Sequence, residues 1–469
     1  MNKMASADDF SRQGVADAIS VLKQQFGDRL SESEAVRSHH SHTTTRIPQQ
    51  LPDAVVFAKS TQEVSDVVTA CHQYGCPVIA FGIGSSLEGH VNAPFGGICI
   101  DTSEMNNIIN VNTEDLDAVV QPGVTREALN EYLRDTGLFF PIDPGANASL
   151  GGMAATRASG TNAVRYGTMK DNVLALEAVM ADGRIIRTGS RAKKTAAGYD
   201  LTRLLVGSEG TLGIITELTV KLYGVPEMIA GGICSFPSVE AACNAVITTI
   251  QYGIPVSRIE LLDEVQVRAC NAYSGLSLPE NPLLLLEFHG TEAGVAEQAE
   301  LFTSIAADYT DASFDWTTDA AERKKLWKAR HDAYFATMNL LPGGSGVSTD
   351  VCVPISRLAE CVNETHQDIQ NEGLLSTIVG HVGDGNFHCM PLAMVDDDEM
   401  NAKISKFVSR LSERAIRMGG TCTGEHGIGQ GKQDYLVREM GESVEFMKMI
   451  KSSFDPKGIM NPGKIFPQS

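Results

Sequence analysis

The sequence lacks a long apolar run, an excess of positive charge and closely paired cysteines. No apolar run approaches the roughly 18 residues that a membrane-spanning helix needs. The 58 acidic side chains outnumber the 38 basic ones and give a net charge of -20. A nucleic-acid partner is therefore not expected, because phosphate binding needs clustered positive charge. The ten cysteines are scattered without a C-x-x-C pair, which predicts free thiols in a reducing compartment.

The N-terminal segment also lacks the apolar core of a signal peptide, and Asp8 and Asp9 do not suit a transit peptide. We therefore expect a cytoplasmic protein that could still touch a membrane peripherally. With 469 residues, of which 43% are hydrophobic, the chain can build two or three domains with a sizeable core.

The first part of the chain has the pattern of alternating helices and buried strands. Apolar residues at helical spacing predict an amphipathic helix over residues 14–26. The segment from residue 31 to 51 reads as an irregular connector, in which solvated loop histidines are favoured over a metal site. These histidines are His39, His40 and His42. Short apolar runs and one helical segment then predict a β-α-β start. The strands are expected at 54–58, 77–81 and 97–102, with the helix at 60–75.

Further strands are predicted before and after Pro226. Those before it lie at 116–123, 173–183 and 213–224, and the second of them ends in the turn dipeptide Asp182-Gly183. Beyond Pro226, strands at 231–236, 257–263 and 282–290 alternate with long helices at 238–253 and 291–309. This order fits an open sheet covered by helices on one side. The stretch from about Gly420 is glycine-rich again, which suggests that the chain returns to its first domain.

Three glycine-rich loops point to one extended ligand. Gly82, Gly84, Ser85 and Ser86 directly follow a predicted strand and form a candidate pyrophosphate cradle. Leu87 stands where the G-x-G-x-x-G dinucleotide fingerprint has its third glycine, so that fingerprint is absent. The segments 144–167 and 207–216 are also rich in small residues, which let a flat cofactor approach the backbone.

The segment "HVGDGNFH", residues 381–388, has a histidine at each end. If Asp384 and Gly385 are the central residues of a two-residue hairpin, His381 faces His388 across the ladder. Directly opposed residues have Cβ atoms roughly 4.5 to 5.5 Å apart, which suits two imidazoles that bind one cation. The alternative is a surface hairpin with two solvated histidines, because a metal site needs a third ligand.

Long motifs carry a resemblance to a known family. They are "FGIGSSLEGHVNAPFGG", "PIDPGANASLGGMAATRASGTNAVRYGTMKDNVL", "TAAGYDLTRLLVGSEGTLGIIT", "STDVCVPISRL", "IVGHVGDGNFHC", "GTCTGEHGIGQGK" and "DPKGIMNPGKIF". From about residue 45 onward the chain resembles the FAD-linked, cytochrome-type D-lactate dehydrogenases of the vanillyl-alcohol oxidase and p-cresol methylhydroxylase superfamily. The FAD-linked glycolate oxidase subunits and the D-2-hydroxyglutarate dehydrogenases are similar families.

The resemblance implies an α+β fold with a two-subdomain PCMH-type FAD-binding domain. An α+β cap with an antiparallel sheet covered by helices completes it. The expected parts are an N-terminal helix and connector (1–46), the FAD-binding domain (47–224), the cap (225–419) and a C-terminal segment that returns to the FAD-binding domain (420–469).

The resemblance also implies which residues hold noncovalent FAD. Gly82, Gly84, Ser85 and Ser86 would hold the pyrophosphate, and Leu87 joins them. Those expected along the flavin and ribityl chain are Pro144, Gly145, Leu150, Gly151, Gly152, Ala155, Ser159, Gly160 and Gly167. Glu209, Gly210 and Ile215 would lie near the adenine half, and Asn461 completes the cofactor set. His90 falls near the first loop, but nothing in the sequence favours a covalent bond to flavin.

By the same resemblance, Glu425 is the third metal ligand beside His381 and His388, and the ion is zinc or manganese. Two imidazoles and one carboxylate leave positions open, as expected of a catalytic ion. His426, whose ordinary pKa of about 6.5 lies near neutrality, is the candidate base. The alternative for His426 is a residue that only supports the ligands or lies on the surface.

Arg330 matches the family position that pairs with the substrate carboxylate, a task suited to its bidentate fork. The alternative is a helix-surface arginine, because residues 319–336 are strongly charged and helical in pattern. His331 is expected to be structural. Ser348 stands where the D-2-hydroxyglutarate enzymes carry a lysine, which favours a short substrate such as lactate.

The resulting prediction is an FAD- and metal-dependent enzyme that oxidises D-lactate, or a similar D-2-hydroxy acid, to the 2-oxo acid. Electrons would pass to cytochrome c, a quinone or another flavoprotein, because no nicotinamide fingerprint is present. The alternatives are a glycolate oxidase subunit, a D-2-hydroxyglutarate-type dehydrogenase, and a flavin-binding subunit of a larger complex. A homodimer stays open.

Overall fold

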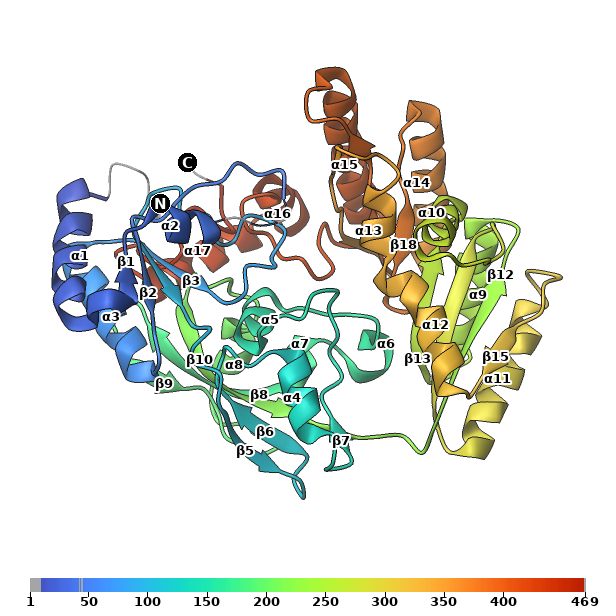
Figure 1. Cartoon of the computed structure of the whole chain (residues 1–469), viewed down its shortest axis with the longest axis horizontal. Helices are drawn as coiled ribbons and strands as arrows, with labels where there is room; N and C mark the ends of the chain where they lie inside the picture. Colours follow the sequence, from blue (N-terminus) through green and yellow to red (C-terminus); the bar gives the residue numbers. More distant parts are fainter. Residues whose placement is uncertain (1–9, 42, 44, 468–469) are drawn as a thin grey trace. The chain divides into compact units, whose positions relative to one another are not determined.

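The computed structural model describes residues 10–41, 43 and 45–467 and divides the chain into two compact units (Figure 1). Unit 1 consists of Met1–Ser159, Gly167–Val225 and Glu425–Ser469. Unit 2 consists of Gly160–Tyr166 and Pro226–Gly424. Each unit has its own sheets and its own hydrophobic core.

The first sheet of unit 1 has the strand order β1-β2-β4-β3. Its strands are β1 (Leu30–Ser31), β2 (Ala54–Phe57), β3 (Val78–Phe81) and β4 (Ile98–Asp101). β4 pairs in parallel with both β2 and β3, and α3 (Thr61–Tyr74) connects β2 to β3. The Ser60 side chain caps α3, and Gly75 in the left-handed conformation ends it. Together with α1 (Arg12–Phe26), these elements confirm the predicted first helix and β-α-β start.

The second sheet of unit 1 consists of antiparallel pairs and has the order β5-β6-β10-β8-β9. Its strands are β5 (Ile108–Asn112), β6 (Asp117–Val120), β8 (Val173–Met180), β9 (Ile185–Arg187) and β10 (Gly213–Lys221). The helices α4 (Arg126–Leu133), α5 (Leu150–Thr156) and α8 (Leu201–Leu205) contribute buried apolar residues to the same core as this sheet. The three strands predicted in this part of the chain are therefore confirmed.

The connector after α1 is more ordered than predicted. It contains the short helix α2 (Glu34–His39), after which the His40 ring is buried. His40 Nε2 lies 2.8 Å from an Asp101 carboxylate oxygen, and its Nδ1 lies 2.7 Å from the Val36 carbonyl. The prediction of solvated histidines is therefore wrong for His40, because α2 turns this ring into the interior. His39 is exposed, and His42 lies outside the described residues.

The last part of unit 1 joins its first sheet. The Asn461 backbone N–H donates to the Val78 carbonyl over 2.7 Å, and Val78 forms a parallel β-bridge with Met460. Ile459 and Met460 are fully buried in the core that surrounds the sheet. The helices α16 (Gln433–Met440) and α17 (Ser443–Phe454) precede this strand-like segment.

Unit 2 has a seven-stranded sheet with the order β15-β12-β14-β13-β18-β19-β17, in which neighbouring strands pair antiparallel. Its strands are β12 (Met228–Ser235), β13 (Val256–Leu262), β14 (Leu283–Gly290), β15 (Asp315–Thr317), β17 (Val351–Cys352), β18 (Ile378–Gly380) and β19 (Asn386–Cys389). The predicted antiparallel sheet is therefore present.

Helices cover both faces of this sheet, whereas the sequence predicts one covered face. On β14, Leu284 and Leu286 belong to one core, and Leu283 and Leu285 belong to another. The first core includes residues of α9 (Val239–Gln251), α11 (Glu292–Ala306), α14 (Leu358–Glu372) and α15 (Asp398–Arg417). The second includes residues of α10 (Glu264–Ser274), α12 (Ala320–His331) and α13 (Ala333–Met338). A run of four leucines has no polar face, so both of its sides must be covered.

Residues 160–166, which the sequence places in the FAD-binding region, belong to unit 2. The Tyr166 hydroxyl lies 2.9 Å from His289 Nδ1, and His289 Nε2 lies 2.7 Å from Glu287. Arg165 donates to the His289 carbonyl over 3.0 Å. These contacts attach the segment to β14.

Two predictions from composition can be compared with the structure. All ten cysteines, each within the described part of the chain, are free thiols. Among helices of the described residues, we find none that is both long enough and apolar enough to span a bilayer.

Candidate active site

The loop after β3 has the features of an anion cradle. Gly84 adopts a φ of +69°. The Ser86 hydroxyl oxygen is buried and has no hydrogen-bond partner in the described part of the chain. A Cβ at Gly82 would lie 2.3 Å from the Ser149 hydroxyl oxygen, so this position tolerates only glycine without movement. The loop therefore fits a ligand that accepts hydrogen bonds, such as the predicted pyrophosphate.

Some of the predicted cofactor glycines face open space. A Cβ at Gly145 would meet no atom within 4 Å, and one at Gly152 would meet only the Ser149 hydroxyl oxygen at 3.1 Å. At Gly210, with a φ of +72°, the nearest atom would be 3.8 Å away. Backbone that is open in this way leaves room for a flat cofactor at these three positions.

Other predicted glycines are explained by packing against the protein. A Cβ at Gly151 would lie 2.4 Å from Pro122, and one at Gly167 would lie 2.7 Å from the Asp171 carboxylate. Gly167 also has a φ of +76°, which a side chain rarely adopts. The small residue at these two places is needed by the fold, whatever else the position contacts.

The remaining predicted cofactor residues lie in several environments. Leu150 and Ile215 belong to the hydrophobic core of unit 1, and Ala155 packs against it. Ser159 is buried and Ser85 is exposed, and Gly160 belongs to unit 2. Leu87 and Pro144 are partly buried.

Glu209 holds a loop of its own unit. Its carboxylate accepts hydrogen bonds from the backbone N–H groups of Ile428 and Gly429 over 2.7 and 2.8 Å, and His90 Nε2 lies 3.1 Å away. Burial alone would raise the pKa of Glu209, but the charge of His90 and the hydrogen bonds lower it overall. The residue therefore stabilises the loop that follows His426. The residue itself adopts a φ of +54°.

Asn461 connects the same loops. Its side-chain amide donates to the Glu209 carbonyl over 2.7 Å and to the His90 carbonyl over 3.3 Å. Lys464 donates to the Asn461 side-chain oxygen over 3.3 Å and to the Asn92 carbonyl over 2.6 Å. Burial lowers the pKa of Lys464 to about 7, although Glu209 partly opposes this change. The residues around the predicted adenine half thus form one connected network.

The loop between β18 and β19 differs from the predicted hairpin. His388 pairs with Val379, not with His381. The single 3-10 turn η4 (Val382–Asp384) is followed by Gly385 with a φ of +79°, where a Cβ would lie 2.1 Å from the Val353 carbonyl oxygen. The prediction of two directly opposed histidines is therefore wrong, because a longer loop replaces the two-residue turn. The two imidazole rings nevertheless meet, with centroids 5.5 Å apart and planes at 84°.

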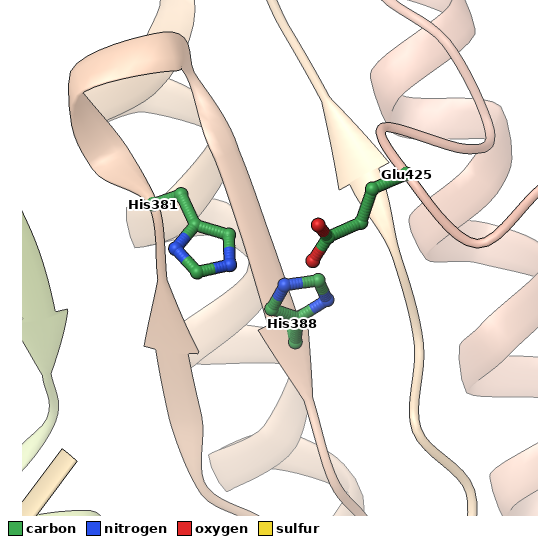
Figure 2. Close-up of side chains that lie close together, drawn as sticks. All are labelled: His381, His388 and Glu425. Atoms are coloured by element: carbon green, nitrogen blue, oxygen red, sulfur yellow. The ribbon is translucent and has the colours of Figure 1, made fainter. Parts of the chain in front are cut away.

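His381, His388 and Glu425 form one cluster. Their ligand atoms all lie within 4.8 Å of one another, and Figure 2 shows the two imidazoles and the carboxylate pointing toward a common centre. Two imidazoles and a carboxylate are a common donor set for a divalent ion. The three side chains therefore fit such an ion, as the resemblance implies.

The backbone before Glu425 is held by residues of unit 2. Glu425 is bonded to Gly424, the last residue of that unit. The Thr423 hydroxyl donates to the Asp350 carboxylate over 2.9 Å. A Cβ at Gly424 would lie 2.3 Å from the Asn386 side-chain nitrogen, so the chain passes very close to β19. These contacts position Glu425 beside the two histidines.

Hydrogen bonds orient both imidazoles. His381 Nδ1 lies 2.7 Å from the Glu260 carboxylate, and His388 Nδ1 lies 2.9 Å from the Thr349 carbonyl. An acceptor at Nδ1 favours the tautomer with its proton there, which leaves Nε2 as the atom that can bind an ion. Both rings therefore have the arrangement of metal-binding histidines.

Glu260 connects His381 to Arg330. Arg330 Nε donates to the second Glu260 carboxylate oxygen over 2.6 Å, and the Glu260 side chain is 0% exposed. Burial would raise the pKa of Glu260, but the charges of His381 and Arg330 and their hydrogen bonds lower it overall. The described residues offer no hydrogen bond to the terminal nitrogens of Arg330, so its fork can receive a carboxylate.

The other predicted residues of the reacting centre are His426, His331 and Ser348. His426 is partly buried and directly follows Glu425. His331 Nδ1 lies 2.9 Å from the Trp327 carbonyl within α12, which agrees with a structural role. Ser348 is partly buried.

The sequence did not identify Glu260 as a site residue. The signal was present, because "SRIELLD" places one carboxylate inside an apolar strand, where an unpaired charge is costly. Its partners, however, lie 70 and 121 residues farther along the chain.

Solved structures share the fold of this chain. p-Cresol methylhydroxylase with bound substrate superimposes with a TM-score of 0.81 at 17% identity, covering 98% of each chain. 4-Ethylphenol oxidase from Gulosibacter chungangensis gives a TM-score of 0.78 at 19% identity, covering 98% of this chain and 99% of that one. The fold is that of the PCMH-type flavoproteins.

Sequence relatives define the family within this class. Residues 52–189 match the FAD binding domain, and residues 225–465 match the FAD linked oxidases, C-terminal domain. A probable mitochondrial D-lactate dehydrogenase of Danio rerio is 50% identical over 96% of this chain and 92% of its own length. The mitochondrial D-lactate dehydrogenase [cytochrome] of Arabidopsis thaliana is 44% identical over 97% and 81%, and glycolate oxidase subunit GlcD of Bacillus subtilis is 34% identical over 94% of each. The chain belongs to the FAD-linked oxidase family that includes the cytochrome-type D-lactate dehydrogenases, and it is an FAD-dependent oxidoreductase.

Proposed function

We propose that this enzyme oxidises D-lactate, or a similar short D-2-hydroxy acid, to the 2-oxo acid. The observation that carries the proposal is the His381–His388–Glu425 cluster, connected through Glu260 to Arg330. It occurs in a chain that is 50% identical to a probable D-lactate dehydrogenase. A 2-hydroxy acid has a hydroxyl and a carboxylate on adjacent carbons, so an ion site and an arginine fork provide one partner for each.

Two groups that are not amino acids contribute to this chemistry. FAD, when bound, supplies the two-electron acceptor that no side chain can provide. A divalent ion, zinc or manganese, would be held by His381, His388 and Glu425, and when bound it supplies a positive charge that favours the deprotonated hydroxyl. The FAD residues proposed are those predicted from the sequence, with the strongest support at Ser86, whose buried hydroxyl has no hydrogen-bond partner among the described residues.

The side chains have separate tasks in the proposal. Arg330 binds the substrate carboxylate through its terminal nitrogens, because its Nε already donates a hydrogen bond to Glu260. His426 accepts the hydroxyl proton, and the loop after it is held by Glu209. Ser348, at the position where the D-2-hydroxyglutarate enzymes carry a lysine, weakens the case for a distal carboxylate and favours a substrate with a short side chain.

Electrons would pass on to cytochrome c, a quinone or another flavoprotein, and the word "cytochrome" in the relatives' names supports the first. A cytoplasmic location with peripheral membrane contact, and a homodimer, remain separate predictions. Four of the relatives are named as mitochondrial, which does not support a plain cytoplasmic location.

The second candidate is glycolate oxidation as one subunit of a complex, which the 34% identity to glycolate oxidase subunit GlcD favours. Glycolate has the same hydroxyl and carboxylate as lactate but no methyl group. The two candidates therefore differ in substrate preference and in whether the chain works alone.

Anaerobic mixing tests both candidates. The FAD-loaded full chain is mixed separately with D-lactate, L-lactate, glycolate and D-2-hydroxyglutarate, and the flavin absorbance is followed. We expect D-lactate to bleach the flavin fastest and L-lactate to leave it yellow. Faster bleaching by glycolate would favour the second candidate, and a flavin that no hydroxy acid bleaches would contradict both. Reduction of added cytochrome c by the bleached enzyme then tests the acceptor.

A further inference from the structure

Glu260 is a charged residue in the middle of the buried strand β13. Its side chain is 0% exposed, and its strand neighbours Ile259 and Leu261 belong to a hydrophobic core. A carboxylate in such a place is costly unless cations or hydrogen-bond donors surround it. Within the described chain, its side-chain hydrogen bonds go to His381 and Arg330, one on each oxygen.

The two bonds join groups with different tasks. His381 is a proposed metal ligand, and Arg330 is the proposed receptor of the substrate carboxylate. Because both oxygens of one planar group are used, the distance between the imidazole and the guanidinium is fixed by the carboxylate itself. Both side chains are then held before any ligand arrives, which reduces the entropy lost on binding.

We propose that Glu260 is a positioning residue that orients the metal ligand His381 and the carboxylate-binding Arg330 together. This inference rests on the proposed function. Glu260 does not itself bind the ion or the substrate in this proposal. It orients His381 toward the ion and Arg330 toward the substrate carboxylate. A carboxylate that accepts the Nδ1 proton of a metal-binding histidine fixes its tautomer and ring orientation, and the same carboxylate here also fixes an arginine.

The proposal predicts two linked defects in Glu260→Gln. The glutamine side chain has nearly the same shape, but it carries one acceptor oxygen and one NH₂ donor. Since His381 and Arg330 both donate, one of the two hydrogen bonds must be lost. We expect Mn²⁺ affinity to fall by about 10- to 100-fold, as is usual when a partner of a metal ligand is removed. We also expect the KM for D-lactate to rise by about 10-fold as Arg330 loses its orientation.

Glu287 provides a matched control. It lies on the neighbouring strand β14, is also buried, and also sits between a histidine and an arginine. His289 Nε2 is 2.7 Å from one of its oxygens, and Arg258 is 3.7 Å from the other. Neither His289 nor Arg258 belongs to the proposed site. Glu287→Gln therefore removes a buried charge of the same kind without touching the metal ligands or Arg330.

The experiment measures Mn²⁺ binding to the FAD-loaded full chain by calorimetry, and the KM and kcat for D-lactate, in wild type, Glu260→Gln and Glu287→Gln. Both variants are expected to lose stability to urea. Only Glu260→Gln should bind Mn²⁺ more weakly and show a raised KM, while Glu287→Gln stays within about 2-fold of wild type in both. Wild-type Mn²⁺ affinity in Glu260→Gln would overturn the inference, and so would equal losses in the two variants.

A second variant covers the case in which Glu260→Gln does not fold. Glu260→Asp keeps the charge and shortens the side chain by one methylene, so it cannot reach both partners equally well. It should also weaken Mn²⁺ binding, and unchanged binding would again overturn the inference. Failure of the proposed function would give a different result. In that case wild type itself would show no Mn²⁺ binding, or only binding that His388→Ala leaves unchanged.

Discussion

The two units present proposed ligand-binding groups of different kinds. Unit 1 offers backbone at glycines such as Gly145, where a Cβ would meet no atom within 4 Å. Unit 2 offers charged and aromatic side chains, such as His381 and Arg330, which are joined through the buried Glu260. Backbone contacts suit a large cofactor whose shape is constant, whereas side chains can change from one relative to another without loss of the fold.

Two buried carboxylates show the same contrast in detail. Glu209 of unit 1 is bonded to the backbone N–H groups of Ile428 and Gly429, and Glu260 of unit 2 is bonded to the side chains of His381 and Arg330. The pKa of each is lowered despite burial. A carboxylate that accepts hydrogen bonds from backbone N–H groups stabilises a loop. A carboxylate that is hydrogen-bonded to side chains orients those side chains.

The largest expected effect is that of His381→Ala. The variant loses one proposed metal ligand of unit 2 and should leave the glycine loops of unit 1 intact. We expect kcat/KM for D-lactate to fall by about 1000-fold or more, because a bound ion contributes several kcal/mol to such a reaction. The flavin content, read from the absorbance spectrum, should equal that of wild type. Simultaneous loss of flavin would contradict the separation of tasks between the units.

Arg330→Lys should have the next largest effect. Lysine keeps the charge but loses the fork, so it cannot bond Glu260 and a substrate carboxylate in the same geometry. We expect the KM for D-lactate to rise by about 10- to 100-fold with a smaller change in kcat, as for the loss of one or two hydrogen bonds to a charged group. Steady-state kinetics measures both constants. A KM equal to that of wild type would contradict carboxylate binding by Arg330 and favour the alternative, a helix-surface arginine.

Glu209→Gln tests the carboxylate of unit 1. The glutamine NH₂ would face one of two backbone N–H donors, so one buried donor loses its partner. We expect the free energy of unfolding in urea to fall by about 1–3 kcal/mol. Glu217→Gln on β10 is the matched control, since Glu217 pairs with the exposed Arg187 and should cost about 0–1 kcal/mol. Equal losses in the two variants would show that the loop does not depend on Glu209.

The last prediction concerns the pH dependence of stability at Asp263, which caps α10 and accepts a hydrogen bond from the Gln266 backbone N–H over 2.7 Å. Burial raises its pKa from 3.8 to about 7, whereas Glu260 on the same strand-to-helix segment has two cationic partners and a lowered pKa. Between pH 3.8 and about pH 7, Asp263 keeps its proton in the folded state but has released it in the unfolded state. The free energy of unfolding therefore falls as pH rises through this range.

Asp263→Asn keeps a good helix cap and removes the charge. We therefore expect the stability of this variant relative to wild type to increase from about pH 4 to about pH 7, measured by urea unfolding at several pH values. The exposed cap of α12, Asp319→Asn, controls for the change of side chain. A difference between Asp263→Asn and wild type that does not vary with pH would contradict the assignment.

The parts of the fold that were predicted correctly are determined by neighbouring residues. α1 and α3 follow from apolar spacing, and α3 also follows from the cap at Ser60 and the glycine after it. The parts that were wrong depend on distant residues. The loop at Asp384 and Gly385 could have been a tight hairpin, but the close approach of the Val353 carbonyl favours another backbone path. The second covered face of β14 depends on α12 and α13, about 40 residues later.

The candidate site follows the same rule. The ligands His381, His388 and Glu425 were proposed because they lie in recognisable motifs, and the structure brings them together. Glu260 was missed because its importance comes from partners 70 and 121 residues away. The hydrogen bond from the Ile428 backbone N–H to Glu209 joins residues 219 positions apart in the sequence, and no local pattern predicts it.

The discontinuity of unit 1 has a consequence for synthesis on the ribosome. Its last segment, Glu425–Ser469, provides the bridge from Met460 to β3 and the backbone that Glu209 holds. Unit 2 emerges completely before that segment does, and domains generally fold as they emerge. The nascent chain should therefore acquire a folded second unit while the first still lacks the segment that bridges to β3 and that Glu209 holds.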